Sequence, residues 1–193
     1  DRLVLRFVGG HPMAGRETTG FEAASADLFV DRPWVVVPGR HAGLEDVARV
    51  EWLARAVGAR PIHMDGAAHD AAVAGISHLP LVLAAALVET VAGRPGAPAA
   101  GWSEARRLAA SGWRDMTRLA RGDVAMGTGI AVSNADALAD RIRALQAVLD
   151  GWLRDVGGPD AEAIERRLAD ARAVLEASGS VAPGPVTPGP VTR

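Results

Sequence analysis

The sequence predicts an α/β segment followed by an all-α segment, on two observations. Within the first 64 residues, three short apolar, β-rich runs alternate with helical patterns, as in the rear half of a doubly wound parallel sheet. After Asp65 the patterned stretches have the period of helices. The 193 residues, 49% of them hydrophobic, suit one domain or a part-domain joined to another.

In the first part, the elements expected in order are a strand at 3–8, a helix near 22–28, a strand at 34–37, a helix at 44–57 and a strand at 60–64. The first strand reads as a buried strand of a parallel sheet and leads into Gly9-Gly10-His11. Ligands of open α/β sheets bind outside the carboxyl ends of the strands. We therefore expect His11 in a turn where a ligand can meet it.

The second part opens at Asp65, a suitable N-cap residue, and predicts helices at 66–92, 103–110, 115–132 with interruptions, 134–155 and 160–177. The last part repeats Pro183-Gly184-Pro185-Val186-Thr187 as residues 188–192, cannot bury a core and is expected to be disordered. These patterns divide the chain into residues 1–64, 65–178 and 179–193.

One expected helix is apolar enough for either a membrane or a protein interior. Residues 71–88 carry no formal charge, and their length meets the lower limit of about 18 residues for a membrane-spanning helix. Alanine dominates the run, however, and Ser77, His78 and Pro80 lie in its middle, so we expect a helix buried between subunits and no membrane. Pro80 is expected to interrupt the helix beside His78. A uniform α-helix would place His69 and His78 on opposite faces, which excludes a metal pair.

Composition narrows the function classes. A formal charge of -2 and a pI near 6.2 give no electrostatic reason to expect nucleic acid. The absence of cysteine excludes a disulfide scaffold, an iron–sulfur cluster and a thiolate zinc site. No signal peptide is visible, so the expected location is cytoplasmic.

Three motifs in order carry a family resemblance: Gly9-Gly10-His11-Pro12-Met13-Ala14-Gly15 followed by Glu17 and Gly20, then His69-Asp70 leading into Ser77-His78-Leu79-Pro80, then Gly112-Trp113-Arg114-Asp115-Met116-Thr117-Arg118-Leu119-Ala120. Over roughly residues 3 to 155 the chain closely resembles the prephenate/arogenate dehydrogenase family of tyrosine biosynthesis. Family members begin with a βαβ unit carrying a Gly-rich dinucleotide fingerprint, whereas this sequence has no G-x-G-x-x-G after a strand. It therefore looks like the carboxyl-terminal two-thirds of such an enzyme.

The resemblance implies a fold and an activity. The fold is the rear half of a Rossmann-type parallel sheet plus a helical dimerisation domain. The residues themselves add that the helix at 66–92, uncharged for most of its length, and the apolar stripe of 134–155 offer more hydrophobic surface than one small helical domain hides, so we expect a homodimer. The reaction is the oxidative decarboxylation of prephenate or arogenate with NAD or NADP, and tyrosine would be a feedback ligand. His11 would be the catalytic proton acceptor. Substrate-binding residues would be Arg118, His78, His69, Gly112 and Thr117, and cofactor-binding residues would be Gly10, Pro12, Met13 and Gly15.

Two departures from the family pattern leave the substrate open. Many members read Ser-His-Leu-Pro-His where this chain has Leu81 in place of the second histidine, and many carry an aromatic residue where this chain has Met126-Gly127. Both fall where prephenate and arogenate would be told apart. The choice between NAD and NADP is also open, because the residue that contacts the ribose would lie outside this sequence.

Two other interpretations compete with this one. A β-hydroxyacid-type dehydrogenase would depend on a lysine, and this sequence has none, which counts strongly against that enzyme class. The alternative from another class is a non-catalytic helical dimerisation or aromatic-acid-binding module, which the lack of the dinucleotide fingerprint favours. In that case the fragment itself would be inactive.

Overall fold

The computed structural model describes residues 5–15 and 20–179. The chain forms two compact units, one running up to Ile142 and the other starting at Arg143. The first unit holds the sheet and most of the helices. The second is a pair of helices.

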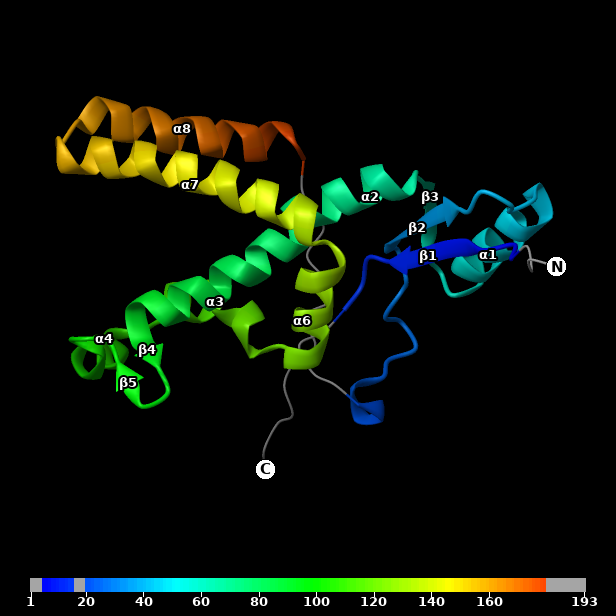
Figure 1. Cartoon of the computed structure of the whole chain (residues 1–193), viewed down its shortest axis with the longest axis horizontal. Coiled ribbons are helices and arrows are strands. Elements are labelled where there is room, and N and C mark those ends of the chain that lie inside the picture. The colour runs from blue at the N-terminus through cyan, green and yellow to red at the C-terminus, as the bar shows by residue number, and fades with distance from the viewer. Residues whose placement is uncertain (1–4, 16–19, 180–193) are drawn as a thin grey trace. The chain divides into compact units, whose positions relative to one another are not determined.

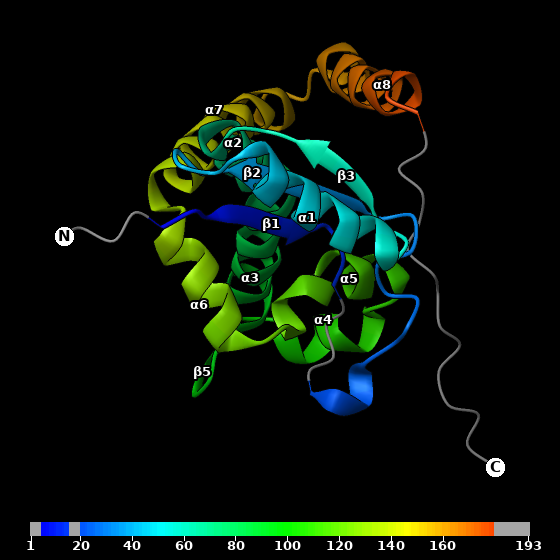
Figure 2. The same cartoon turned by 90° about the vertical axis from the view of Figure 1, so that its right-hand side faces the viewer.

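The sheet has three strands in the order β1 (Val8–Pro12), β2 (Pro33–Pro38) and β3 (Arg60–His63) (Figure 2). β2 and β3 are parallel, and α1 (Leu44–Ala56) connects them. The side chains of Val35 and Val36 in the central strand are buried, as is Ala54 of α1, and α1 packs against all three strands. The α/β class and the elements expected at 34–37, 44–57 and 60–64 are confirmed.

Two expectations for the first part are wrong in detail. Of the strand expected at 3–8, residues 3 and 4 lie outside the described residues and residues 5–7 are not in a strand, so β1 begins at Val8. β1 is antiparallel to β2, so His11 lies inside the strand opposite Val35 and not in a following turn. Hydrogen bonds to β2 hold Gly9 and Gly10 in the ladder despite their weak strand preference. The helix expected near 22–28 is only a turn of 3-10 helix, η1 (Phe21–Ala23). Ser25 donates a hydrogen bond to Asp27, a local pairing that favours turns over helix.

The longest helical stretch is made of α2 (Gly66–Val73), the π-helical segment η2 (Ala74–His78) and α3 (Leu79–Ala92) in direct succession, and Figure 1 labels its two α-helical parts. Asp65 caps it as expected, because its Oδ1 accepts a hydrogen bond from the Ala68 amide at 2.8 Å. The interruption expected beside Pro80 takes the form of the π segment, in which the Leu79 amide donates to the Ala74 carbonyl five residues back. Pro80 then occupies the first turn of α3, where its missing N–H does little harm.

The remaining elements follow the expected pattern within a few residues. A short hairpin, β4 (Gly93–Arg94) and β5 (Ala97–Pro98), leads into α4 (Trp102–Leu108) and α5 (Ser111–Met116). A tilted ring contact between Trp102 and Trp113 joins these two helices, with centroids 5.4 Å apart. Then come η3 (Arg118–Arg121), which packs against α3, and the helices α6 (Val124–Ser133), α7 (Ala135–Gly157) and α8 (Ala161–Ala177). The tail expected to be disordered lies, from residue 180 on, outside the described residues.

The stretch Gly66–Ala92 is only partly buried, and most of its large apolar side chains are half-buried. It is long and apolar enough to cross a membrane by length and composition, with a mean hydropathy of 2.1, and the core helices of soluble proteins pass the same test. Only 22% of its most apolar window is buried within the single chain. The burial expected for this helix is therefore not supplied by one copy of the described residues.

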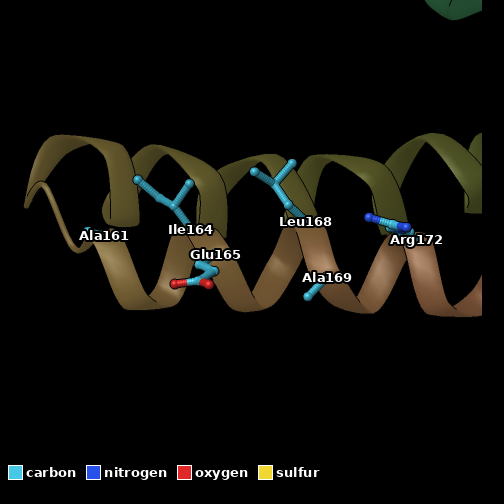
Figure 3. A pocket seen from close by; sticks show the side chains of 6 residues that line it. All are labelled: Ala161, Ile164, Glu165, Leu168, Ala169 and Arg172. Carbon is cyan, nitrogen blue, oxygen red and sulfur yellow. The ribbon is translucent and has the colours of Figure 1, made fainter.

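The second unit is built from the end of α7 and from α8. Arg167 pairs with Asp155 and lies over the ring of Trp152, 5.6 Å from its centroid. Gly151 makes room for this arginine, because a Cβ there would lie 2.5 Å from its Nη2. A shallow apolar groove runs along α8 (Figure 3), lined by Ala161, Ile164, Glu165, Leu168, Ala169 and Arg172. Its two charged side chains make no catalytic arrangement.

Candidate active site

Two histidines from distant parts of the chain meet where the sheet approaches the long helix. His11 lies on β1 and His69 on α2, and His11 Nδ1 is 2.8 Å from His69 Nε2. Their rings meet edge to face, with centroids 5.0 Å apart and an interplanar angle of 71°. Such an edge-on approach suits a hydrogen bond between two ring nitrogens.

Asp70 sets the direction of this hydrogen bond. His69 Nδ1 lies 2.9 Å from Asp70 Oδ1, and an ionised carboxylate can only accept. His69 therefore carries its proton on Nδ1 and, as a neutral ring, accepts through Nε2. The proton of the shared bond then belongs to His11 Nδ1. His11 Nε2 is left with a lone pair, as a proton acceptor requires.

The surroundings also keep His11 neutral. Partial burial lowers its pKa from the ordinary histidine value, and the nearby charges that His69 and His78 can carry lower it further. The pKa of His78 is lowered by burial first and then by His69, with Asp70 acting in the opposite direction. Neutral rings are therefore favoured at His11 and His78 near neutral pH.

His78 lies on the π segment and is only 8% exposed. The side chain of Asn134, from the junction of α6 and α7, bridges it to the start of the same helical stretch. Asn134 Nδ2 lies 2.8 Å from the Asp70 carbonyl oxygen and 3.2 Å from His78 Nδ1. The expectation that His69 and His78 face opposite ways fails, because it assumed a uniform α-helix. A π segment takes one more residue per turn, so each residue rotates less, and both histidines act on His11.

Three other residues singled out in the sequence lie on neighbouring elements. Thr117, 3% exposed, donates its hydroxyl to the Trp113 carbonyl at 2.8 Å, a bond that closes the end of α5. Gly112 is an exposed residue of α5 with open space around its Cβ position. Arg118 is exposed at the start of η3, the element that packs against α3. The histidine cluster is thus built by β1, α2, η2 and Asn134, and the arginine belongs to a separate element.

The residues expected to bind a cofactor follow His11 along the chain or precede it. Gly10 lies against Trp34 of β2, and a Cβ on Gly10 would be 2.8 Å from the indole Nε1. That indole N–H is a buried donor with no hydrogen-bond partner among the described residues. After Pro12, the Ala14 amide donates to the Pro12 carbonyl at 2.8 Å, and Gly15 has open space at its Cβ position. Gly10 and Gly15 themselves are exposed.

The two departures from the family pattern turn out to be neighbours in space. A Cβ on Gly127 of α6 would lie 3.5 Å from Leu81 Cδ2 of α3. Both positions have lost the polar or aromatic group that the resemblance would lead one to expect. This corner is therefore apolar and small.

Sequence reasoning missed Asn134 and the orientation that Asp70 imposes. An asparagine between two helical runs reads as a helix-end residue, and its backbone does serve there. Nothing in the local pattern indicates a side-chain partner 56 or 64 positions away. By contrast His63, which belongs to none of the three sequence motifs, pairs with Glu51 on α1 and lies outside the cluster.

Family models match nearly the whole described chain. The model described as the nucleotide-binding domain of prephenate dehydrogenase matches residues 2–63, and the one described as its dimerization domain matches residues 65–169. The prephenate dehydrogenase of Bacillus subtilis is 32% identical over 151 residues, which are 78% of this chain and 38% of that protein. The chain spans less than half the length of the curated relatives it matches.

Solved structures agree with these matches. The crystal structure of Synechocystis arogenate dehydrogenase superposes with a TM-score of 0.75 at 31% identity, covering 90% of this chain and 62% of that one. The prephenate dehydrogenase of A. aeolicus, solved in complex with hydroxyphenyl propionate and NAD+, has a TM-score of 0.78 at 24% identity, covering 90% of this chain and 59% of that one. At that identity the second likeness concerns the fold alone.

The lowered pKa values of His11 and His78 predict that acid destabilises this fold. A histidine whose pKa is lower in the folded than in the unfolded state binds fewer protons when folded, so stability is full above the unfolded value and falls as the pH drops below about 6.5. Urea unfolding midpoints measured from pH 7.5 to 5.5 should decrease. The decrease should be smaller in a His78→Gln variant, and an equal slope in both proteins would contradict the prediction.

Proposed function

Because the dimerization-domain model alone matches more than half of its residues, the chain belongs to the prephenate dehydrogenase family, and we propose that its protein catalyses the NAD(P)-dependent oxidative decarboxylation of prephenate or arogenate. The observation that carries this proposal is the hydrogen-bonded series Asp70, His69, His11. It ends on a ring nitrogen prepared to accept a proton. The activity needs such an acceptor for the hydroxyl of the substrate ring.

In the proposed mechanism His11 Nε2 accepts the hydroxyl proton of the substrate as the carbonyl forms. The positive charge that develops on His11 is shared with His69 through the 2.8 Å hydrogen bond and is balanced by the Asp70 carboxylate. Asp70 also holds His69 in one tautomer, a role that a carboxylate commonly has beside a catalytic imidazole. His69 would then be a positioning residue for His11 as well as a neighbour of the substrate.

NAD or NADP, when bound, would supply the acceptor for the hydride of the ring carbon, and loss of carbon dioxide from the ring would then give the aromatic product. The chain would contact its nicotinamide end through the backbone next to His11, at Gly10, Pro12, Met13 and Gly15. The exposure of Gly10 and Gly15 and the open space at the Cβ position of Gly15 support this placement. The match to a nucleotide-binding domain model supports the use of NAD or NADP and does not distinguish the two.

The substrate would be held by the elements around the histidines. We assign Arg118 to a carboxylate, because a guanidinium matches a carboxylate in two parallel hydrogen bonds. His78 would bind an oxygen atom of the substrate, and Gly112 would let it approach α5 closely. Thr117 would contribute to the substrate site indirectly, by fixing the end of α5, since its hydroxyl already donates to the Trp113 carbonyl. The apolar corner of Leu81 and Gly127 would face the part of the substrate in which prephenate and arogenate differ.

We also propose a homodimer formed through the helical part. The support is the incomplete burial of the apolar stretch Gly66–Ala92, together with the match of residues 65–169 to a dimerization domain. Association hides such surface from water, which drives most protein–protein binding.

Replacing His11 tests the activity and its base together. Protein expressed from the complete reading frame that encodes this chain should reduce NAD or NADP when given prephenate or arogenate, as measured by the absorbance of the reduced cofactor. His11→Asn should lower kcat about a hundredfold or more, the usual scale for a lost general base. His41→Asn in an exposed loop is the control. Binding of prephenate without turnover in the unmodified protein would favour the non-catalytic module instead.

A variant of His69 separates positioning from substrate binding. His69→Asn should lower kcat about ten- to hundredfold and leave KM for the substrate nearly unchanged, since the lost hydrogen bond acts on His11. His63→Asn, a histidine on β3 paired with Glu51, should behave as the unmodified protein. A raised KM at unchanged kcat would mean that His69 binds the substrate and does not position the base.

Arg118 should affect substrate affinity alone. Arg118→Ala should raise KM for the substrate about ten- to hundredfold, because a lost charge-assisted hydrogen bond costs about 1.5–3 kcal/mol. The affinity for cofactor should not change. Arg121→Ala at the other end of η3 is the matched control. An Arg118→Ala protein that loses cofactor binding but keeps substrate binding would refute the assignment.

A further inference from the structure

Asn134 stands at a fixed point between two helices. Its amide N–H donates to the Ile130 carbonyl at 3.2 Å and ends α6, and its carbonyl accepts from the Leu138 amide at 3.0 Å and begins α7. Its backbone angles, φ -121° and ψ 38°, belong to neither helix. With both backbone groups bonded, the direction of the side chain is set by the two helices it joins.

The chemistry of its neighbours fixes which way the Asn134 amide points. A backbone carbonyl can only accept, so the atom 2.8 Å from the Asp70 oxygen must be the NH2 nitrogen. The same nitrogen lies 3.2 Å from His78 Nδ1. An NH2 group has two hydrogens, one for each of these acceptors. His78 Nδ1 is therefore unprotonated, and a neutral His78 carries its proton on Nε2.

We propose that Asn134 is a positioning residue that holds His78 as the neutral, Nε2-protonated tautomer, so that His78 offers a hydrogen-bond donor to a substrate oxygen. The inference rests on the proposed function for the identity of the substrate, but the tautomer itself does not. The two histidines then have opposite polarity: His11 presents an acceptor for a hydroxyl and His78 a donor for a carboxylate or carbonyl oxygen. A substrate with both groups is recognised in one orientation.

The surroundings of His78 favour its neutral ring on balance, because its pKa is lowered. Burial and His69 favour the uncharged ring, whereas Asp70 alone favours the imidazolium. A second proton on Nδ1 would point at the NH2 group of Asn134, setting donor against donor. The asparagine thus opposes both the other tautomer and the charged ring.

The tautomer is read directly by nuclear magnetic resonance. Two-bond proton–nitrogen spectra of ¹⁵N-labelled protein distinguish a protonated from an unprotonated ring nitrogen, and the signals of His78 are those lost in a His78→Gln variant. The unmodified protein should show the proton of His78 on Nε2. A proton on Nδ1 would overturn the proposal without any variant of Asn134.

Asn134→Asp is the sharpest variant, because it keeps the shape and removes the donor. A carboxylate can only accept, so the His78 proton should move to Nδ1 or a second proton should be added there. Ser133→Asp adds the same charge one residue earlier, on an exposed side chain, and should leave the tautomer unchanged. An Asn134→Asp protein with its proton still on Nε2 alone would contradict the proposal.

Kinetics connect the tautomer to the substrate. Asn134→Asp and Asn134→Ala should each raise KM for prephenate or arogenate about tenfold, the scale of one misdirected hydrogen bond, and leave KM for the cofactor unchanged. Ser133→Asp should change neither constant. If the unmodified protein has no dehydrogenase activity, the proposed function fails while the spectra still decide the role of Asn134. Normal activity with an unchanged KM in both Asn134 variants would refute the positioning role alone.

Discussion

The hydrogen bond between His11 and His69 is the contact on which the site depends. It joins a strand of the sheet to the first turn of the long helix, across 58 positions of sequence. Its direction comes from Asp70, whose carboxylate can only accept, and not from either imidazole. A single acidic side chain, itself more than half exposed, thereby decides which nitrogen of a histidine on another element keeps a lone pair.

This arrangement places demands on the fold around it. β1 must pair with β2 through two glycines so that His11 projects from the sheet, and Gly10 also leaves room for the Trp34 indole. The cap at Asp65 fixes the helix start four residues before His69, whose amide donates to the Asp65 carbonyl at 2.9 Å. The site is therefore assembled by ordinary backbone pairing and capping.

Much of this could be predicted from the sequence. The apolar runs at β2 and β3, the caps and the helical periods locate most elements, and the three motifs lead to the family. Contacts over long sequence distances could not be predicted, because a local pattern holds no information on which distant partner a polar side chain meets. Asn134 and the pairing of His11 with His69 are of this kind. The antiparallel β1 was missed for a related reason: strand direction is decided by the partner strand, and the periodicity of one strand is the same in either direction.

The π segment between α2 and α3 has a further consequence for how this chain tolerates change. One extra residue is accommodated in the turn that ends at His78. Loss of one residue within 74–78 would let the regular hydrogen-bond ladder close and would remove the extra residue, so that α3 keeps the same stripe toward η3. Loss of one residue in the regular turns of α2 or α3 would instead rotate everything beyond it by about 100° about the helix axis. A change of length within 74–78 therefore alters the backbone around His78 alone, whereas the same change in the flanking turns would reorient the rest of the helix.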